Sequence, residues 1–116
     1  MNNSSWVKEF PAAIKACDAN GILIMMNDIA EKNAETKGGR GLIGKSIIPL
    51  HSDPSKEKIN MMLKKHSINC YTIEKNGVKV LIYQSPWYEK NEFKGIVELS
   101  LEIPWDMPHY VREVKK

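Results

Sequence analysis

The dipeptide Asn76-Gly77 limits the possible folds of this chain more than any other feature. It separates two strand-like runs, residues 69–74 and 78–85. A two-residue β-hairpin turn favours this pair, because both of its residues tolerate positive φ. A second turn, at residues 89–92, leads into a third strand-like run at residues 93–103. The second half of the chain is therefore predicted to form antiparallel strands.

The last of these runs alternates in hydrophobicity. Every second residue from Val97 to Ile103 is apolar, and the residues between them are polar. A period of two predicts a strand that turns one face towards the protein core. We expect the side with Leu99 and Leu101 to be that core face.

The first half of the chain predicts a hairpin and two helices. Apolar runs at residues 13–17 and 22–26 flank a turn that holds Asp18 and Asn20-Gly21. Asn27 is a plausible N-cap for a helix at residues 27–35, and Asp53-Pro54 opens a stronger helix that ends near Lys65. A glycine-rich connection, residues 37–49, joins the helices. The expected fold class is α+β, with a five-stranded antiparallel sheet and helices on one face.

The ends of the chain are predicted to lie outside this domain. The expected division is a helical extension at 1–12, the domain at 13–103 and a tail at 104–116. Trp6 and Phe10 lie four residues apart, so they share one face of a short helix. We expect that face to pack on the outer surface of the sheet and to help form a homodimer, because a helix this short is unstable alone.

Composition excludes several classes of protein. The net charge is only +3, and the basic residues are spread along the chain, whereas nucleic-acid binders gather theirs into a patch. The longest apolar run, residues 22–26, is too short to span a membrane. We find no secretory signal and expect a cytoplasmic protein whose Cys17 and Cys70 are reduced, buried thiols.

Residues 39–46, from Gly39 to Ser46, match the Walker A pattern of nucleotide-binding loops. A functional loop of this kind follows a buried strand and precedes a helix. Here a helix is predicted before it, and Pro49 follows it where a helix should continue. This context argues against a phosphate-binding loop. A small nucleotide-binding enzyme that uses residues 39–46, with Lys45, therefore stays only as the alternative hypothesis. No other group of side chains in the sequence resembles a catalytic site, and we expect that the protein is not an enzyme.

The order of these features resembles the PAS fold. Asp18 and Gly21 match a D-x-x-G turn between strands, Asn27 and Ala30 match N-x-x-A at the next helix, and Gly95 begins a long closing strand; residues 42–46 read L-I-G-K-S. The resemblance implies a sensory or signalling module that binds a small ligand or a protein partner. PAS strands often end in Asp-Ile-Thr before a linker to an output domain, whereas here Ile103 is followed by Pro104. The resemblance therefore implies either output through a separate signalling protein or an output arrangement that differs from the usual one.

The predicted ligand pocket lies between the core face of the sheet and the second helix. The cofactor is not identified by the sequence, and we expect no metal site. A filled core formed by the same side chains is the competing interpretation. The residues assigned to the pocket are His51, Ile59, Met62, Tyr71, Tyr83, Leu99 and Leu101.

Overall fold

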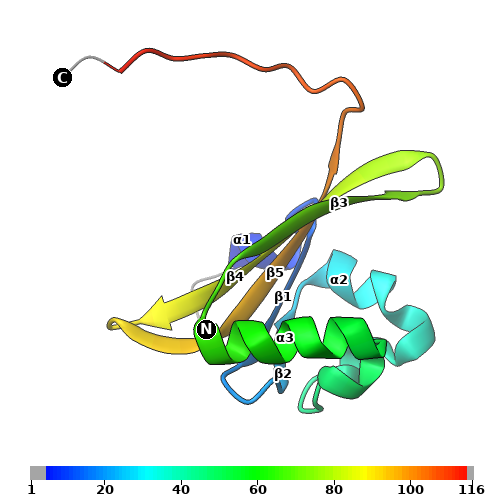
Figure 1. The fold of residues 1–116 in the computed structure, drawn as a ribbon. Helices are drawn as coiled ribbons and strands as arrows, with labels where there is room; N and C mark the ends of the chain where they lie inside the picture. The colour runs from blue at the N-terminus through cyan, green and yellow to red at the C-terminus, as the bar shows by residue number, and fades with distance from the viewer. Residues whose placement is uncertain (1–4, 115–116) are drawn as a thin grey trace.

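The computed structural model describes residues 5–114 and confirms a five-stranded antiparallel sheet (Figure 1). The sheet has the order β2-β1-β5-β4-β3, so the first and last strands of the sequence are neighbours at its centre. The strands are β1 (Ala13–Asp18), β2 (Leu23–Met26), β3 (Asn69–Lys75), β4 (Val78–Glu89) and β5 (Glu92–Ile103). The helices are α1 (Ser5–Lys8), α2 (Asp28–Asn33) and α3 (Asp53–Lys65), with 3₁₀ turns η1 (Glu35–Lys37), η2 (Gly39–Leu42) and η3 (Ile48–Leu50) between the last two.

The predicted hairpins are confirmed, and each follows from local turn chemistry. Asn76 and Gly77 have φ of 53° and 81° between β3 and β4. Lys90 and Asn91 have φ of 53° and 67° between β4 and β5. Between β1 and β2, Asp18 Oδ1 accepts hydrogen bonds from the backbone N–H groups of the second and fourth residues after it.

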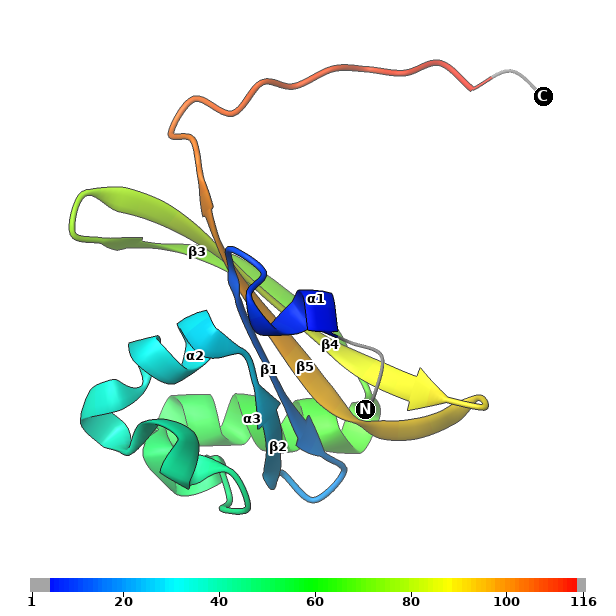
Figure 2. The same cartoon turned by 180° about the vertical axis from the view of Figure 1, so that it is seen from behind.

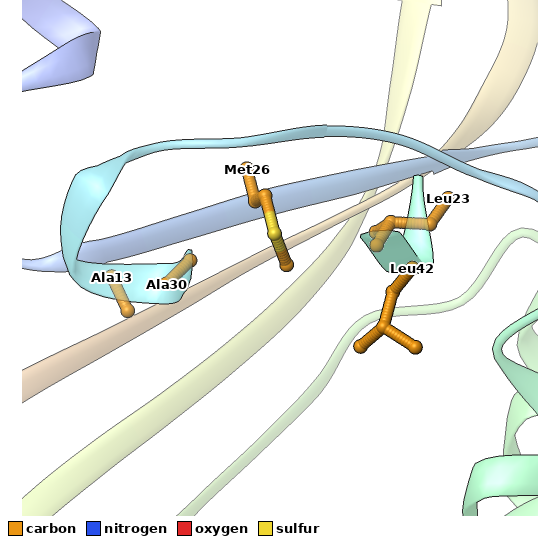
Figure 3. Packing of buried hydrophobic residues seen from close by; sticks show 5 residues of the cluster. All are labelled: Ala13, Leu23, Met26, Ala30 and Leu42. Carbon is orange, nitrogen blue, oxygen red and sulfur yellow. The ribbon is translucent and has the colours of Figure 1, made fainter. Parts of the chain in front are cut away.

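Helices α2 and α3 cover one face of the sheet, and α1 lies on the other side (Figures 1 and 2). We call the covered side the helix face; its β1 residues are Ala13, Lys15 and Cys17. The opposite side is the outer face, which includes Ile14. One core cluster joins β1, β2, α2 and η2 on the helix face (Figure 3), through Ala13, Leu23, Met26, Ala30 and Leu42.

The apolar side of β5 lies on the outer face, which corrects the expectation that it faces the helices. Met62 of α3 packs against Cys17 and Ile96, so Ile96 lies on the helix face. Side chains of a strand alternate between faces, which places Glu98 on the helix face and Leu99 on the outer face. Alternation shows which residues share a face, but it does not show which face the helices cover.

Asn27 joins the N-terminal segment, β1 and α2. This buried side chain accepts hydrogen bonds from Ile14 N and Ala30 N, at 3.0 and 3.1 Å. Its amide Nδ2 lies 2.8 Å from Ala12 O, 3.0 Å from Val7 O and 3.4 Å from Phe10 O. The predicted N-cap of α2 is therefore confirmed, and the same side chain also holds the segment that follows α1.

Gly95 lies on β5 opposite Asp18 of β1, close to the backbone of β1. A Cβ atom there would collide with the backbone oxygen of Cys17 and with the backbone of Asp18. On β4, Trp87 pairs directly with Gly95, and its indole Nε1 donates to Cys17 O at 3.1 Å. Because Gly95 has no side chain, the indole of Trp87 on β4 can cross β5 and reach β1.

The two cysteines are free thiols with different surroundings. Cys17 is buried as predicted, whereas Cys70 is exposed, which corrects the expectation that both are buried. Cys70 pairs with Tyr83 of β4, but its own strand β3 is the last in the sheet. Within residues 5–114, no helix combines the length and hydropathy that a membrane crossing requires.

Candidate ligand site

Four polar side chains form a row across the helix face of the sheet. Lys15 on β1 pairs with Glu98 on β5, Glu98 pairs with Gln84 on β4, and Gln84 pairs with Asn69 on β3. Residues directly opposite each other on antiparallel strands project to the same face. We call these four residues the polar row.

Neighbouring members of the polar row are bonded to each other. Gln84 Nε2 donates to Glu98 Oε1 at 2.6 Å, and Asn69 Nδ2 donates to Gln84 Oε1 at 2.8 Å. Lys15 Nζ lies 3.5 Å from Glu98 Oε2. The side chain of Glu98 is only 23% exposed and that of Lys15 38%, so water screens this ion pair less than one at the surface.

A cavity of about 40 Å³ lies between the row and α3. Its polar wall comes from Lys15, Gln84 and Glu98 of the row and from His51. The apolar remainder consists of Ala16, Cys17, Leu23, Ile47, Ile59, Met62 and Ile96. A single water needs roughly 10–15 Å³ by this measure, so the cavity has room for a few water-sized groups.

A groove of about 540 Å³ lies beside the cavity, between α3 and the β3–β4 hairpin. The two spaces share Lys15, His51, Ile59, Gln84 and Glu98, so they are adjacent parts of one candidate site. The groove is also lined by the first half of α3 and by β3 and β4. These residues are Pro54, Ser55, Lys58, Asn69, Tyr71, Ile73 and Ile82.

His51 and Tyr71 contribute hydrogen-bonding groups to the groove. His51 Nδ1 lies 2.8 Å from Ile47 O. A carbonyl only accepts, so Nδ1 carries the proton, which leaves Nε2 as an acceptor in the neutral ring. Partial burial and the negative charge of Glu98 raise the pKa of Tyr71, so its hydroxyl remains protonated and can donate at neutral pH.

Cys17 lines the inner cavity as a thiol. Burial is the main cause that raises its pKa above the usual value. Because the thiolate is the nucleophilic form, a raised pKa suppresses its reactivity. Cys17 therefore acts here as a small apolar wall residue. Among the residues described, no three His, Cys, Asp or Glu side chains lie close enough together to hold a metal ion.

The structure separates the seven residues predicted to line one pocket. His51, Ile59, Met62 and Tyr71 lie at the cavity or groove. Three others project from the outer face and are corrected: Tyr83 and Leu99 face each other there, and Leu101 pairs with Leu81 beside them. Their misplacement follows from the reversed faces of β5.

The polar row was missed because charged residues in a strand were expected to face solvent. Two signals in the sequence point to it. Lys15 stands in the middle of an otherwise apolar run, on the same strand face as the buried Cys17. Gln84 likewise follows the apolar residues of β4.

The Walker-like segment has neither the architecture nor the charge of a phosphate loop. Gly39 begins the 3₁₀ turn η2, and Arg40 Nη2 lies 2.7 Å from Glu31 of α2. A hollow beside it is lined by three carboxylates, those of Asp28, Glu31 and Glu35, and by two cations, Lys32 and Arg40. Ser46 forms an isolated bridge with Ile22. Carboxylates beside this loop repel phosphate, so the nucleotide-binding alternative is not favoured.

Trp6 of α1 and Phe10, which follows α1, contact each other. Their rings pack edge to face with centroids 5.7 Å apart. Trp6 is 64% exposed and Phe10 39%. Both therefore offer apolar surface on the described chain.

No protein-family profile and no curated protein matches the sequence, but solved structures match the fold. The PAS domain of Bordetella pertussis BvgS has a TM-score of 0.59 at 17% identity, over 86% of this chain and 82% of that one. The Vibrio cholerae Aer2 receptor, described as a dual PAS-heme oxygen sensor, has a TM-score of 0.58 at 13% identity, over 80% and 95%.

VqmA bound to DPO is also similar to this chain. VqmA is a Vibrio cholerae protein, and this structure has a TM-score of 0.65 at 11% identity, over 86% of this chain and 56% of that one. These matches cover 80–86% of this chain and support the fold described above. The chain is a PAS-fold domain.

Proposed function

We propose that this domain is a sensory module that binds a small polar ligand between α3 and the polar row. The observation that carries the proposal is the adjoining cavity and groove, which lie against the polar row of Lys15, Glu98, Gln84 and Asn69. Ligand sites typically combine apolar walls with a few placed polar groups. The VqmA structure, in which that protein is bound to DPO, supports the use of this fold for binding a ligand.

Filling the groove is expected to abolish ligand binding without unfolding the domain. Ser55 is half-buried in the first turn of α3 and lines the groove. A tryptophan at this position occupies that space, while an open groove leaves room for the larger side chain. The test is a thermal-shift screen of small polar metabolites against the wild type and Ser55→Trp.

Glu57→Trp is the matched control, because Glu57 is exposed on the same helix and does not line the site. Compounds that stabilise the wild type and Glu57→Trp, but not Ser55→Trp, support the site. If every binding compound stabilises all three proteins equally, the ligand lies elsewhere and the proposal is wrong.

We also propose that two copies associate through the outer face and the α1 segment, and that a separate signalling protein reads the state of the dimer. A patch of apolar residues crosses the outer face: Leu81, Tyr83, Val97, Leu99 and Leu101. Helix α1 lies on the same side of the sheet (Figure 2) and carries the exposed Trp6. Unpartnered apolar surface of this kind favours association.

Trp6→Ser is expected to weaken this dimer at least about tenfold, since buried tryptophans dominate interfaces. Light scattering across a concentration series measures the dissociation constant. Met61→Ser is the control, because Met61 is an exposed apolar residue of α3, on the other side of the sheet. An unchanged dissociation constant in Trp6→Ser would remove α1 from the interface.

A further inference from the structure

The charges of the groove point to the chemical class of its ligand. Its ionised side chains are Lys15, Lys58 and Glu98. Lys15 and Glu98 form the partly buried ion pair of the polar row, and Lys58 stands one helical turn beyond Ser55 on α3. A charged ligand that reaches Lys15 or Glu98 must either disturb this pair or satisfy both of its members.

A ligand with a single charge leaves one member of the pair uncompensated. A monoanion bound to Lys15 leaves Glu98 without a charged partner, and Glu98 repels the monoanion. A monocation bound to Glu98 leaves Lys15 without a charged partner. Breaking a partly buried pair by removing one partner is costly. A zwitterion avoids this, because its carboxylate takes Lys15 while its ammonium takes Glu98 Oε2.

The surroundings of the pair favour a carboxylate near α3. Lys58 adds a second positive charge on that side of the groove. The first turn of α3, with Pro54 and Ser55, lines the same space, and the side chain of the N-cap Ser52 bonds to Ser55 Oγ at 3.4 Å and caps no backbone N–H group. The start of a helix carries a partial positive charge that attracts anions, so this end of α3 adds to the two lysines.

The inner cavity limits the remainder of the ligand. Beyond the row it is bounded by apolar side chains, including Cys17, Leu23, Met62 and Ile96. Its volume of about 40 Å³ admits only a few heavy atoms. A short aliphatic side chain fits this space, and an indole ring does not.

We propose that the domain binds an α-amino acid with a small aliphatic side chain, inserted into the Lys15–Glu98 ion pair. This inference rests on the proposed ligand site and adds the identity of the ligand class. In the complex, the carboxylate lies against Lys15, with Lys58 beyond it, the ammonium lies against Glu98, and the side chain enters the inner cavity.

Calorimetric titration of the whole chain with L-valine and its two half-molecules tests the inference. Isobutylamine keeps the ammonium and the branched chain, and isovalerate keeps the carboxylate and the branched chain. L-Valine is expected to bind at least about tenfold more tightly than either, because only it satisfies both members of the ion pair. L-Tryptophan is expected to bind at least about tenfold more weakly than L-valine.

Glu98→Gln makes the test specific to the charge. Without the carboxylate, Lys15 has no charged partner, so L-valine is expected to lose at least about tenfold in affinity while isovalerate gains. Glu102→Gln is the matched control, since Glu102 lies on the same strand but outside the groove. It is expected to leave all affinities unchanged.

The outcomes separate this inference from the proposed site. Neutral compounds whose binding Ser55→Trp abolishes, together with no preference for L-valine over its half-molecules, would overturn the amino-acid class and leave the site standing. If no compound binds in a manner that Ser55→Trp blocks, the site itself is wrong, and the inference is wrong with it. An unchanged preference in Glu98→Gln also overturns the inference.

Discussion

Gly95→Ala is expected to lower the free energy of unfolding by about 3 kcal/mol or more. The added Cβ would overlap the backbone oxygen of Cys17 and approach the backbone of Asp18. Backbone atoms cannot rotate away as a flexible side chain can, so β1 and β5 must separate at the centre of the sheet. Gly95 also has a φ of 150°, which residues with a Cβ rarely adopt.

Chemical denaturation monitored by circular dichroism measures this loss. Gly41→Ala is the control, because a Cβ there meets nothing within 4 Å and its φ is not positive. That variant is expected to stay within about 0.5 kcal/mol of the wild type. A loss below about 1 kcal/mol in Gly95→Ala would show that the two strands tolerate a side chain between them.

Asn27→Ala is expected to lower the free energy of unfolding by about 3 kcal/mol, because it leaves several buried backbone groups without hydrogen-bond partners. The N–H groups of Ile14 and Ala30 lose their acceptor, and the carbonyl of Ala12 loses its donor. The cost is high because these groups lie away from water, as does Asn27 itself.

Hydrogen exchange adds a local measure to the denaturation curve. Asn27 holds the carbonyls of Val7 and Phe10, so residues 7–12 are expected to lose protection before the sheet does. Asn60→Ala provides the comparison, since Asn60 is exposed on α3 and alanine favours a helix. Equal stability of the two variants would show that Asn27 does not hold the N-terminal segment.

The turns and caps of this domain could be predicted from the sequence because they depend on neighbouring residues. Asn76-Gly77 specifies its own hairpin, and Asn27 caps the helix that begins beside it. The placement of β1 between β2 and β5 depends on contacts between distant parts of the chain, and no local pattern contains it. The PAS resemblance supplied the fold through the order of several weak motifs.

The lining of the candidate site was predicted only in part, for a physical reason. Its α3 residues, Ile59 and Met62, follow from helical periodicity, and both line the cavity. Leu99 and Leu101 were assigned to the wrong face of the sheet. Residues on both faces of β5 are at least partly buried. Hydrophobicity alone therefore does not identify the face that the helices cover. Glu98 becomes a site residue only through the strands that bring Lys15 and Gln84 beside it.

The central position of β1 also has a consequence for biosynthesis. Ile14, near the start of the domain, pairs with Leu99, near its end. The middle of the sheet therefore cannot close until β5 has left the ribosome, and β1 must wait with only β2 as a partner. Pairing between such distant segments folds slowly, and waiting strand edges are prone to join other chains. We expect this domain to complete its folding only after translation of β5, and to depend on chaperones while it waits.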